Sequence, residues 1–377
     1  MSAKQIYATV NKIAKNIGYT GSDVIDVTTF TAFGQAALSD TLMTESVYNA
    51  LYDLIGKTVI AIDEAEDDER NIVVDAFEYG SILQKFSFQC QEAQKASEWD
   101  IEHPESPYDV ERKEGIIPTY FEQYIPAFAW EDVSYVRQLA EAFRGPEYLA
   151  GFNEALYTRM YNAFRMAKNG LSDAAIGGLM GTVYEAATAG TPSTNAARQV
   201  RHLLTEYNTI MGTSLTNDTS RNNANYVEYV RKQLIKDKMN LNKLTKLYND
   251  ASVERRTPDE NYRLDVSLDF AASFDKFWAD SYNTEYVQLP KHNTIVNWGI
   301  ATDPEKVKVS LDGGTSTTTV DKIIAFAYDK DAVVATMDRS RFVSIYDQWN
   351  DRNVFKLEAE RRYIADPSEN CIIYLND

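Results

Sequence analysis

Hydrophobic positions recur at helical spacing near the start of the chain. The apolar residues of 6–17 follow one another at steps of three and four, which predicts an amphipathic helix that ends before Gly18. After a stretch of mixed pattern, the same spacing predicts a second helix at 42–55, ended by Gly56. A short apolar run at 59–62 then predicts a strand.

The period of the pattern changes to two in the next region. Phe86, Phe88 and Cys90 alternate with polar residues, which predicts a half-exposed strand. A charged segment interrupted by proline, 95–114, separates this strand from a second aromatic strand near 120–128. We therefore expect a long antiparallel excursion of the chain with a polar tip.

The clearest helical pattern lies in the middle of the chain. Pro146 stands at a favourable first position and Asn169-Gly170 supplies a stop, so we expect a helix of about 22 residues, or about 33 Å. A shorter helix is predicted before it, at 131–143. One apolar stripe follows the longer helix: Leu149, Phe152, Leu156, Met160, Ala163 and Ala167.

Beyond this helix the chain first mixes helices with turns and then changes to strands. Helical patterns cover 197–207, 226–248 and 269–282, with a polar loop at 213–225. Strand patterns cover 295–300, 307–311, 320–328, 341–346 and parts of 354–375. Asp312-Gly313-Gly314 signals a hairpin. This is an α+β chain whose last strands are expected to return to an earlier sheet.

The composition of the chain argues against several classes of function. Of 377 residues, 38 are Lys or Arg and 56 are Asp or Glu, and the net charge of −18 argues against a nucleic-acid-binding surface because phosphate binding requires cations. The longest apolar or small stretch, 174–184, is too short to span a membrane, and the start of the chain lacks the pattern of a secretory signal. Cys90 and Cys371 are too few for a disulfide framework or a structural zinc site. The chain has 24 tyrosines, and tyrosine is a residue type that is enriched at protein interfaces.

The motifs of the chain carry no recognisable catalytic chemistry. Gly56-Lys57-Thr58 resembles the end of a phosphate-binding loop, but Leu51 occupies the position of its first glycine. The segment 177–181 lacks dinucleotide-binding spacing, and close helix packing or a bend explains its glycines better. The acidic run 63–69 lacks the glycine and alternating ligands of a calcium loop. We expect a protein that is not an enzyme and has no cofactor and no metal site.

The order of several stretches is that of one known family. Residues 47–59 have the pattern of a helix that ends in Ile-Gly before a strand. Residues 86–128 have the pattern of an extension with a charged middle, and residues 130–168 that of two helices, of which the second is long. Residues 323–332 and 355–375 read as final strands. This order resembles the tailed-bacteriophage major capsid proteins of the Hong Kong 97 fold, and most of all those of short-tailed phages of the phi-29 type.

The resemblance implies an α+β, Hong Kong 97-type capsid fold. Its implied parts are an N-terminal arm at 1–71, an E-loop at 72–129, a peripheral domain at 130–185 with a spine helix at about 146–168, an axial domain at 186–314, and strands at 315–377 that return to the peripheral domain. An immunoglobulin-like C-terminal domain and a fused scaffolding segment, present in some relatives, are not expected.

The resemblance also implies a function. A major capsid protein assembles with itself, as hexamers and pentamers, into the icosahedral head shell that encloses double-stranded DNA. The other implied partners are a portal protein and a scaffolding protein, with the packaged DNA contacted only non-specifically and no membrane involved. The implied location is the virion capsid, after assembly in the host bacterial cytoplasm. An inner face that is neutral or acidic is expected, since a basic lumen would retain DNA.

The E-loop is implied to lie across an adjacent subunit. Mixed charges and aromatic side chains suit ion pairs and anchoring between subunits. The residues expected to make these contacts are Lys95, Glu98, Trp99, Asp100, Tyr108, Arg112 and Lys113. The alternative is a mobile, solvated loop. Some relatives form a Lys–Asn crosslink, for which Lys85, Lys95 and Lys113 lie in the right region, but non-covalent assembly is favoured because no motif selects one lysine.

Two other functions are weighed against the capsid. An encapsulin-like compartment has the same fold with an enzyme as its cargo. A cytosolic enzyme or carbohydrate-binding protein would use the aromatic residues as stacking platforms, and it predicts a deep pocket with clustered acids.

Overall fold

The computed structural model describes most of the chain and divides into two compact units. The described residues are 3–16, 19–39, 46–47, 73–74, 82–88, 116–122, 127–278, 288–300, 302–310, 317–347, 349–350 and 352–377. Unit 1 comprises Met1–Glu78, Tyr124–Ser172 and Ala335–Arg362, and unit 2 comprises Tyr79–Gln123, Asp173–Val334 and Tyr363–Asp377. Each unit therefore combines segments that are far apart in the sequence. The predicted helix at 42–55 and strand at 59–62 lie almost wholly outside the described residues.

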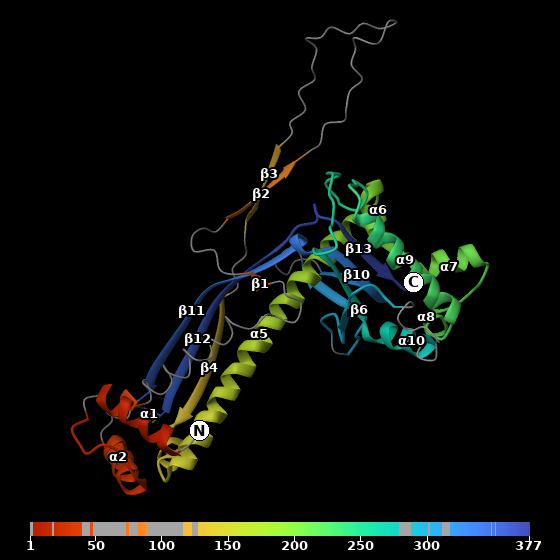
Figure 1. The fold of residues 1–377 in the computed structure, drawn as a ribbon. Helices are drawn as coiled ribbons and strands as arrows, with labels where there is room; N and C mark the ends of the chain where they lie inside the picture. Colours follow the sequence, from red (N-terminus) through yellow and green to blue (C-terminus); the bar gives the residue numbers. More distant parts are fainter. Residues whose placement is uncertain are drawn as a thin grey trace, which may run out of the picture. The chain divides into compact units, whose positions relative to one another are not determined.

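The helices of unit 1 share one hydrophobic core. The predicted first helix is confirmed as α1 (Ala3–Asn16), and a helix that the pattern did not reveal follows as α2 (Val27–Ser39) (Figure 1). Asp26 begins α2, because its carboxylate accepts a hydrogen bond from the Thr29 backbone N–H at 2.7 Å. α2 packs against the end of α4 (Val136–Ala142) through rings, with Phe30 and Phe33 both close to Phe143, and α1 joins this core through Tyr7, whose ring lies beside Phe30.

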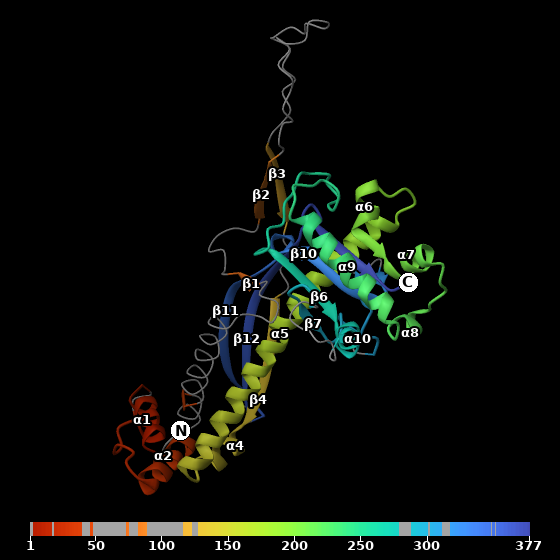
Figure 2. The same ribbon diagram turned by 45° about the vertical axis from the view of Figure 1, so that its right-hand side comes forward.

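The sheet of unit 1 is built from long strands. Its order is β1-β11-β12-β4, with bounds β1 (Val73–Val74), β11 (Val333–Asp347), β12 (Arg352–Ala365) and β4 (Ala127–Tyr135). Figures 1 and 2 show the three long strands side by side. The helix predicted at 131–143 is wrong in its first part, because Glu131–Tyr135 pairs with β12 and only Val136–Ala142 is helical.

The long helix α5 (Pro146–Thr188) begins at the predicted proline but has 43 residues. The predicted stop at Asn169-Gly170, and with it the end of the spine helix near 168, is wrong. The apolar stripe continues past this point through the buried Leu171, Ala175 and Leu179. An interior glycine costs a helix only about 1 kcal/mol relative to alanine, which the burial of those side chains exceeds.

The predicted antiparallel excursion is confirmed at its base. The strands β2 (Ile82–Phe88) and β3 (Ile116–Glu122) pair from Ile82 opposite Glu122 to Phe88 opposite Ile116. The aromatic run predicted near 120–128 is divided between β3 and β4. The polar tip of the excursion lies outside the described residues.

Unit 2 contains a five-stranded sheet that gathers the end of the chain. The order is β5-β13-β10-β6-β7, with bounds β5 (Val200–His202), β13 (Cys371–Leu375), β10 (Ile323–Asp329), β6 (Tyr262–Ser267) and β7 (Asn293–Ile295). The expectation that the last strands return to an earlier sheet is confirmed, since β13 pairs with β10 and β5, and β12 pairs with β4.

Three helices pack against this sheet in one core: α7 (Leu203–Met211), α9 (Ala224–Leu241) and α10 (Leu268–Trp278) (Figure 1). The strands contribute Ala325 and Ala327 to this core, which allow close approach, and Tyr374, which fills it.

The shorter elements of unit 2 correct several boundaries. The helix predicted at 197–207 is interrupted, because α6 (Thr194–Gln199) ends before β5. The helix predicted at 226–248 ends at Leu241, and the loop predicted at 213–225 contains α8 (Asn217–Ser220). The strand predicted at 295–300 is wrong, because only Ile295 of it lies in a strand, at the end of β7. A short helix η2 (Lys330–Ala332) joins β10 to β11.

The predicted hairpin after residue 307 is confirmed as β8 (Val307–Ser310) paired with β9 (Thr317–Val320). Gly177 of α5 faces this hairpin, and a Cβ on it would lie 3.1 Å from Val307 Cγ2. The close helix packing predicted for the glycines at 177–181 is thus confirmed at Gly177.

Candidate functional site

The predicted contact residues of the E-loop, Lys95, Glu98, Trp99, Asp100, Tyr108, Arg112 and Lys113, all lie outside the described residues. The structure describes the paired strands from which this segment departs, β2 and β3. Of the lysines considered for a crosslink, only Lys85 is described, within β2 and opposite Thr119. The proposal for the tip therefore rests on the sequence and on the hairpin at its base.

An open groove lies between α4 and α5 in unit 1. It has a volume of about 370 Å³, and its lining includes Glu141, Phe152 and Arg159. Tyr148, at its edge, is 66% exposed. An aromatic ring left in solvent beside charges of both signs is a composition suited to contact with another protein surface.

A network of ion pairs and hydrogen bonds lies in the interior of unit 2. The Arg201 guanidinium donates to Asp237 Oδ2 at 2.7 Å and also pairs with Glu206, while the Tyr374 hydroxyl donates to the same Asp237 oxygen at 3.1 Å. Burial raises the pKa of Asp237, against the opposing effect of Arg201. Burial lowers the pKa of Arg201, but Glu206 and Asp237 outweigh it and leave that pKa above its usual range. The network joins β5, α7, α9 and β13, so its role is structural.

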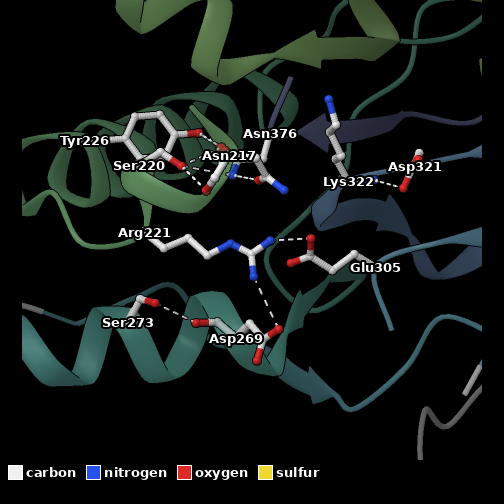
Figure 3. Close-up of polar contacts among 10 residues, drawn as sticks. All are labelled: Asn217, Ser220, Arg221, Tyr226, Asp269, Ser273, Glu305, Asp321, Lys322 and Asn376. Carbon is white, nitrogen blue, oxygen red and sulfur yellow. Dashed lines mark hydrogen bonds and ion pairs between the residues drawn. The ribbon is translucent and has the colours of Figure 1, made fainter. Parts of the chain in front are cut away.

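The residues that follow β13 are held by a second set of polar contacts. The Asn376 amide oxygen accepts from the Tyr226 hydroxyl at 2.5 Å, and its nitrogen donates to Ser220 Oγ at 3.1 Å (Figure 3). His202 Nδ1 lies 2.7 Å from Asp377 Oδ1, and this hydrogen bond raises the pKa of His202. These contacts connect α8, α9 and β5 to the last residues of the chain.

An open, mainly acidic pocket lies beside this closure. It has a volume of about 690 Å³ between α8, α10 and the turn at 303–305. Arg221 lies between Asp269 and Glu305, pairing with Asp269 at 3.3 Å and more closely with Glu305 (Figure 3). Burial raises the pKa of Glu305, which Arg221 opposes. The outer wall carries Asp218 and the 59%-exposed side chain of Asp269.

The described residues offer no arrangement for catalysis. No group of three metal-ligating side chains occurs among them. Burial raises the pKa of the Cys371 thiol to about 12, so this cysteine is not a nucleophile at neutral pH. Within the described part of the chain, no helix combines the length and the apolarity needed to cross a bilayer.

Sequence reasoning missed the polar residues that organise unit 2. The partners Asp237 and Tyr374 are 137 positions apart, and Arg221 and Glu305 are 84 apart, so no local pattern joins them. One local signal was available, namely the spacing of Lys232 and Lys236 along a helix with an apolar opposite face, with Lys243 shortly after it.

Comparisons with known proteins bear on the whole chain. The family model for Phi29-like phage major capsid proteins matches residues 8–375. Among solved structures, a chain in the capsid structure of Staphylococcus phage Andhra gives a TM-score of 0.50 at 7% identity, covering 82% of this chain and 85% of that chain. A chain in the structure of the head fiber and inner core protein gp22 of native bacteriophage P68 gives 0.50 at 8% identity, with the same coverage. At such identities the two structures show a shared fold, in agreement with the predicted Hong Kong 97-type capsid fold. No curated protein sequence matches the chain.

Proposed function

The chain belongs to the Phi29-like phage major capsid protein family, and from this premise we propose how its copies meet one another and the other components of the head. As a member it is a structural protein of the phage virion rather than an enzyme, and it associates with itself to form the head shell. The single observation that carries this conclusion is the match of the family model to residues 8–375.

We propose that the copies form hexamers and pentamers, and that the E-loop of each copy lies across its neighbour. The paired strands β2 and β3 support this proposal, because they give a rigid base to a long segment with few apolar residues. The side chains proposed to contact the neighbour are Lys95, Glu98, Trp99, Asp100, Tyr108, Arg112 and Lys113. Trp99 and Tyr108 supply apolar area, and the charged residues supply ion pairs at its rim.

The assignment of parts to roles belongs to the same proposal. Residues 1–71 are the arm, 72–129 the E-loop, and 186–314 the axial domain that lies near the axis of each hexamer or pentamer. Residues 130–185 form the peripheral domain with its spine helix, and strands of 315–377 return to it. The long strand pairing of β12 with β4 supports this return, whereas β10 and β13 pair with β6 and β5 of the axial segment.

The remaining partners are proposed from the biology that the family implies. A portal protein occupies one vertex, and a scaffolding protein guides assembly in the host bacterial cytoplasm. The packaged double-stranded DNA meets the inner face only non-specifically. The net charge of −18 supports a neutral or acidic inner face, because a lumen rich in Lys and Arg would hold the DNA by counterion release.

Deletion of Ala96–Val110 tests the role of the E-loop. The wild-type chain should form closed shells, seen by negative-stain electron microscopy, whereas the deletion should give a soluble, folded protein without closed shells. A matched control replaces the same residues with a Gly/Ser segment of equal length, which keeps the hairpin connection but removes its side chains. Normal shells from the deletion would overturn the proposed role of the E-loop, and denaturing electrophoresis of wild-type shells would reveal any covalent crosslink.

A further inference from the structure

The exposed face of α9 and the segment that follows it carry lysines and apolar side chains. Lys232, Lys236 and Met239 follow at steps of four and three, which places them on the same side of α9. The exposed Lys243, Leu244 and Leu247 come after Asn242, the residue that caps the end of this helix. We call these six residues the basic stripe. The opposite side of α9 is buried in the core of unit 2 through Val227, Val230, Leu234 and Leu241.

The cations of the basic stripe lack strong partners within the described part of the chain. Lys232, with a side chain 68% exposed, has one carboxylate near it, Glu228 at 3.6 Å. Lys236 and Lys243 are exposed and make no ion pair among the described residues. Residues 231–246 hold six cations and one acid, Asp237, which is buried against Arg201. Three of these cations, Arg231, Lys238 and Lys246, pair with acids outside this range. The positive surface therefore comes from Lys232, Lys236 and Lys243, on a chain of net charge −18.

The composition of the stripe favours a protein partner over nucleic acid. Met239 is 63% exposed, Leu244 57% and Leu247 39%, and all three lie among the lysines. A phosphate backbone is bound by cations and hydrogen-bond donors and gains nothing from such side chains. Protein interfaces, in contrast, combine apolar contact area with charges at the rim, and methionine is enriched in them.

A complementary surface exists on the same chain. In the pocket beside α8 and α10, the acids Asp218, Asp269, Asp303 and Glu305 outnumber the cations Arg221 and Lys276. Arg221 is engaged with Asp269 and Glu305, Lys276 bonds to Asn222 at 3.1 Å, and Asp303 pairs with Lys306. Asp218 is exposed and has no ion-pair partner among the described residues. We call this surface the acidic pocket; Figure 3 shows its Arg221 ion pairs.

One copy cannot bring these two surfaces together. Asn222, at the acidic pocket, immediately precedes the N-cap of α9, whereas Lys236 lies 14 positions further along the chain. At 1.5 Å per residue this is about 21 Å along a rigid helix. Two different, complementary patches on one protein produce a head-to-tail contact between copies, and such contacts close into rings when the rotation fits.

We propose that the basic stripe of one copy docks on the acidic pocket of the next copy around a hexamer or pentamer. The proposal rests on the self-assembly described above and specifies where two copies meet. Lysine side chains of the stripe reach the acids at the pocket mouth, and Met239 and Leu244 contact Ala272 and Pro304 of its lining. Each copy carries both patches, so every copy in the ring contacts two neighbours, one through its basic stripe and the other through its acidic pocket.

Charge reversal and its compensation test this contact. Lys236→Glu with Lys243→Glu should reduce the yield of closed shells about tenfold or more, because like charges would then face each other. Adding Asp218→Lys and Asp269→Lys to the same chain should recover much of the yield. The control, Lys291→Glu with Lys308→Glu, alters two exposed lysines outside the stripe and gives the same net charge. Circular dichroism and thermal melting verify that each variant folds.

The outcomes separate this inference from the function on which it rests. Wild-type shells together with an unaffected stripe variant would overturn the docking contact and leave the capsid function intact. Failure of the wild-type chain to form shells, even with its scaffolding protein, would count against the assembly proposal itself. A stripe variant with normal shells but weakened binding of a fluorescent DNA duplex at 0.15 M salt would assign the stripe to DNA and overturn the proposal. A control variant as defective as the stripe variant would also overturn it, since the effect would then follow from net charge.

Discussion

The helical core of unit 1 and the sheet of unit 2 are both well buried, but different interactions specify them. In unit 1, the aromatic rings of α2 pack between the N-terminal segment and the end of α4: the centre of the Phe33 ring lies 5.1 Å from that of Tyr19 and 5.9 Å from that of Phe143. In unit 2, Arg201 and Tyr374 both donate hydrogen bonds to one buried carboxylate oxygen of Asp237, at 2.7 and 3.1 Å. Apolar contacts can repack at modest cost, whereas a buried polar network is stable only when every member is satisfied.

This difference predicts that the two units respond differently to substitutions in their cores. The helices α1 and α2 are held by apolar contacts, in a core that they share with α4 and the first part of α5. A sheet whose strands come from β5, β6, β10 and β13 forms only when residues 200 to 375 come together. We therefore expect that substitutions in the sheet destabilise unit 2 as a whole, and that substitutions in the arm act locally.

The largest effect is expected from Arg201→Met. It leaves the 3%-exposed Asp237 without its cation, and loss of one partner of a buried pair costs about 3–5 kcal/mol. Hydrogen exchange measured by mass spectrometry should then accelerate together in β5, α9 and β13. Exchange in α1 and α2 should remain as in the wild type. The double variant Arg201→Met with Asp237→Leu should recover much of the lost stability, because it also removes the unpaired buried carboxylate.

A somewhat smaller effect, confined to the arm, is expected from Phe33→Ala. Phe33 is 1% exposed, and removal of a buried phenyl ring costs about 3 kcal/mol. Exchange should accelerate in α1 and α2 while β13 keeps its protection. The matched variant Phe326→Ala removes an equally buried ring from the sheet of unit 2, and it should affect all of that sheet. Equal acceleration in both units after Phe33→Ala would contradict the comparison.

Two glycines give a finer test of how closely each unit is packed. A Cβ on Gly34 of α2 would lie 2.6 Å from Phe143 Cβ, which cannot move without shifting its backbone. Gly34→Ala should therefore destabilise the arm by about 1–3 kcal/mol. A Cβ on Gly177 would meet the ends of two side chains, Val307 Cγ2 at 3.1 Å and Val309 Cγ2 at 3.4 Å, and the gain in helix propensity of about 1 kcal/mol offsets these contacts.

Thermal melting should therefore place Gly177→Ala close to the wild type. Gly178→Ala serves as the reference, because a Cβ there meets nothing within 4 Å, and the substitution should be stabilising. A melting temperature for Gly34→Ala at or above that of Gly178→Ala would show that α2 and α4 are less closely packed than the structure indicates.

The same contrast explains what the sequence could predict. The spacing of apolar residues identified α1, the start of α5, the strands β2 and β8 and the end of β3, because those elements depend on neighbours in the chain. It failed for Glu131–Tyr135, which lies in a strand because β12, more than 200 residues later, pairs with it. It also ended α5 too early at Gly170, since the burial of Leu171 and Leu179 depends on tertiary contacts that no local pattern contains.

The candidate assembly surfaces divide in the same way. The E-loop contacts came from the family resemblance and from charge patterning, and they stay a prediction. The lysines of the basic stripe could have been found from their spacing. The acidic pocket could not, because Asp218, Asp269 and Asp303 come from three separate segments that only the fold brings together.

The smallest predicted effect concerns the contact between His202 and Asp377, and it tests whether the closure of the sheet depends on pH. The hydrogen bond to Asp377 raises the pKa of His202, so the folded protein holds this proton more tightly than the unfolded chain. The resulting stabilisation is fully present below the ordinary histidine pKa of about 6.5 and is lost as pH rises through the raised value. The side chain of His202 is 47% exposed, so solvent screening limits the effect to about 0.5 kcal/mol.

Urea unfolding measures this effect: the difference in free energy of unfolding between the wild type and His202→Gln should shrink from pH 5.5 to pH 8.5. Thr205→Val removes the neighbouring hydrogen bond from the Thr205 hydroxyl to the Asp377 carbonyl, and its cost should be the same at both pH values. A His202→Gln difference that does not change with pH would show that the contact is a neutral hydrogen bond, and that no charged pair contributes to closing the sheet of unit 2.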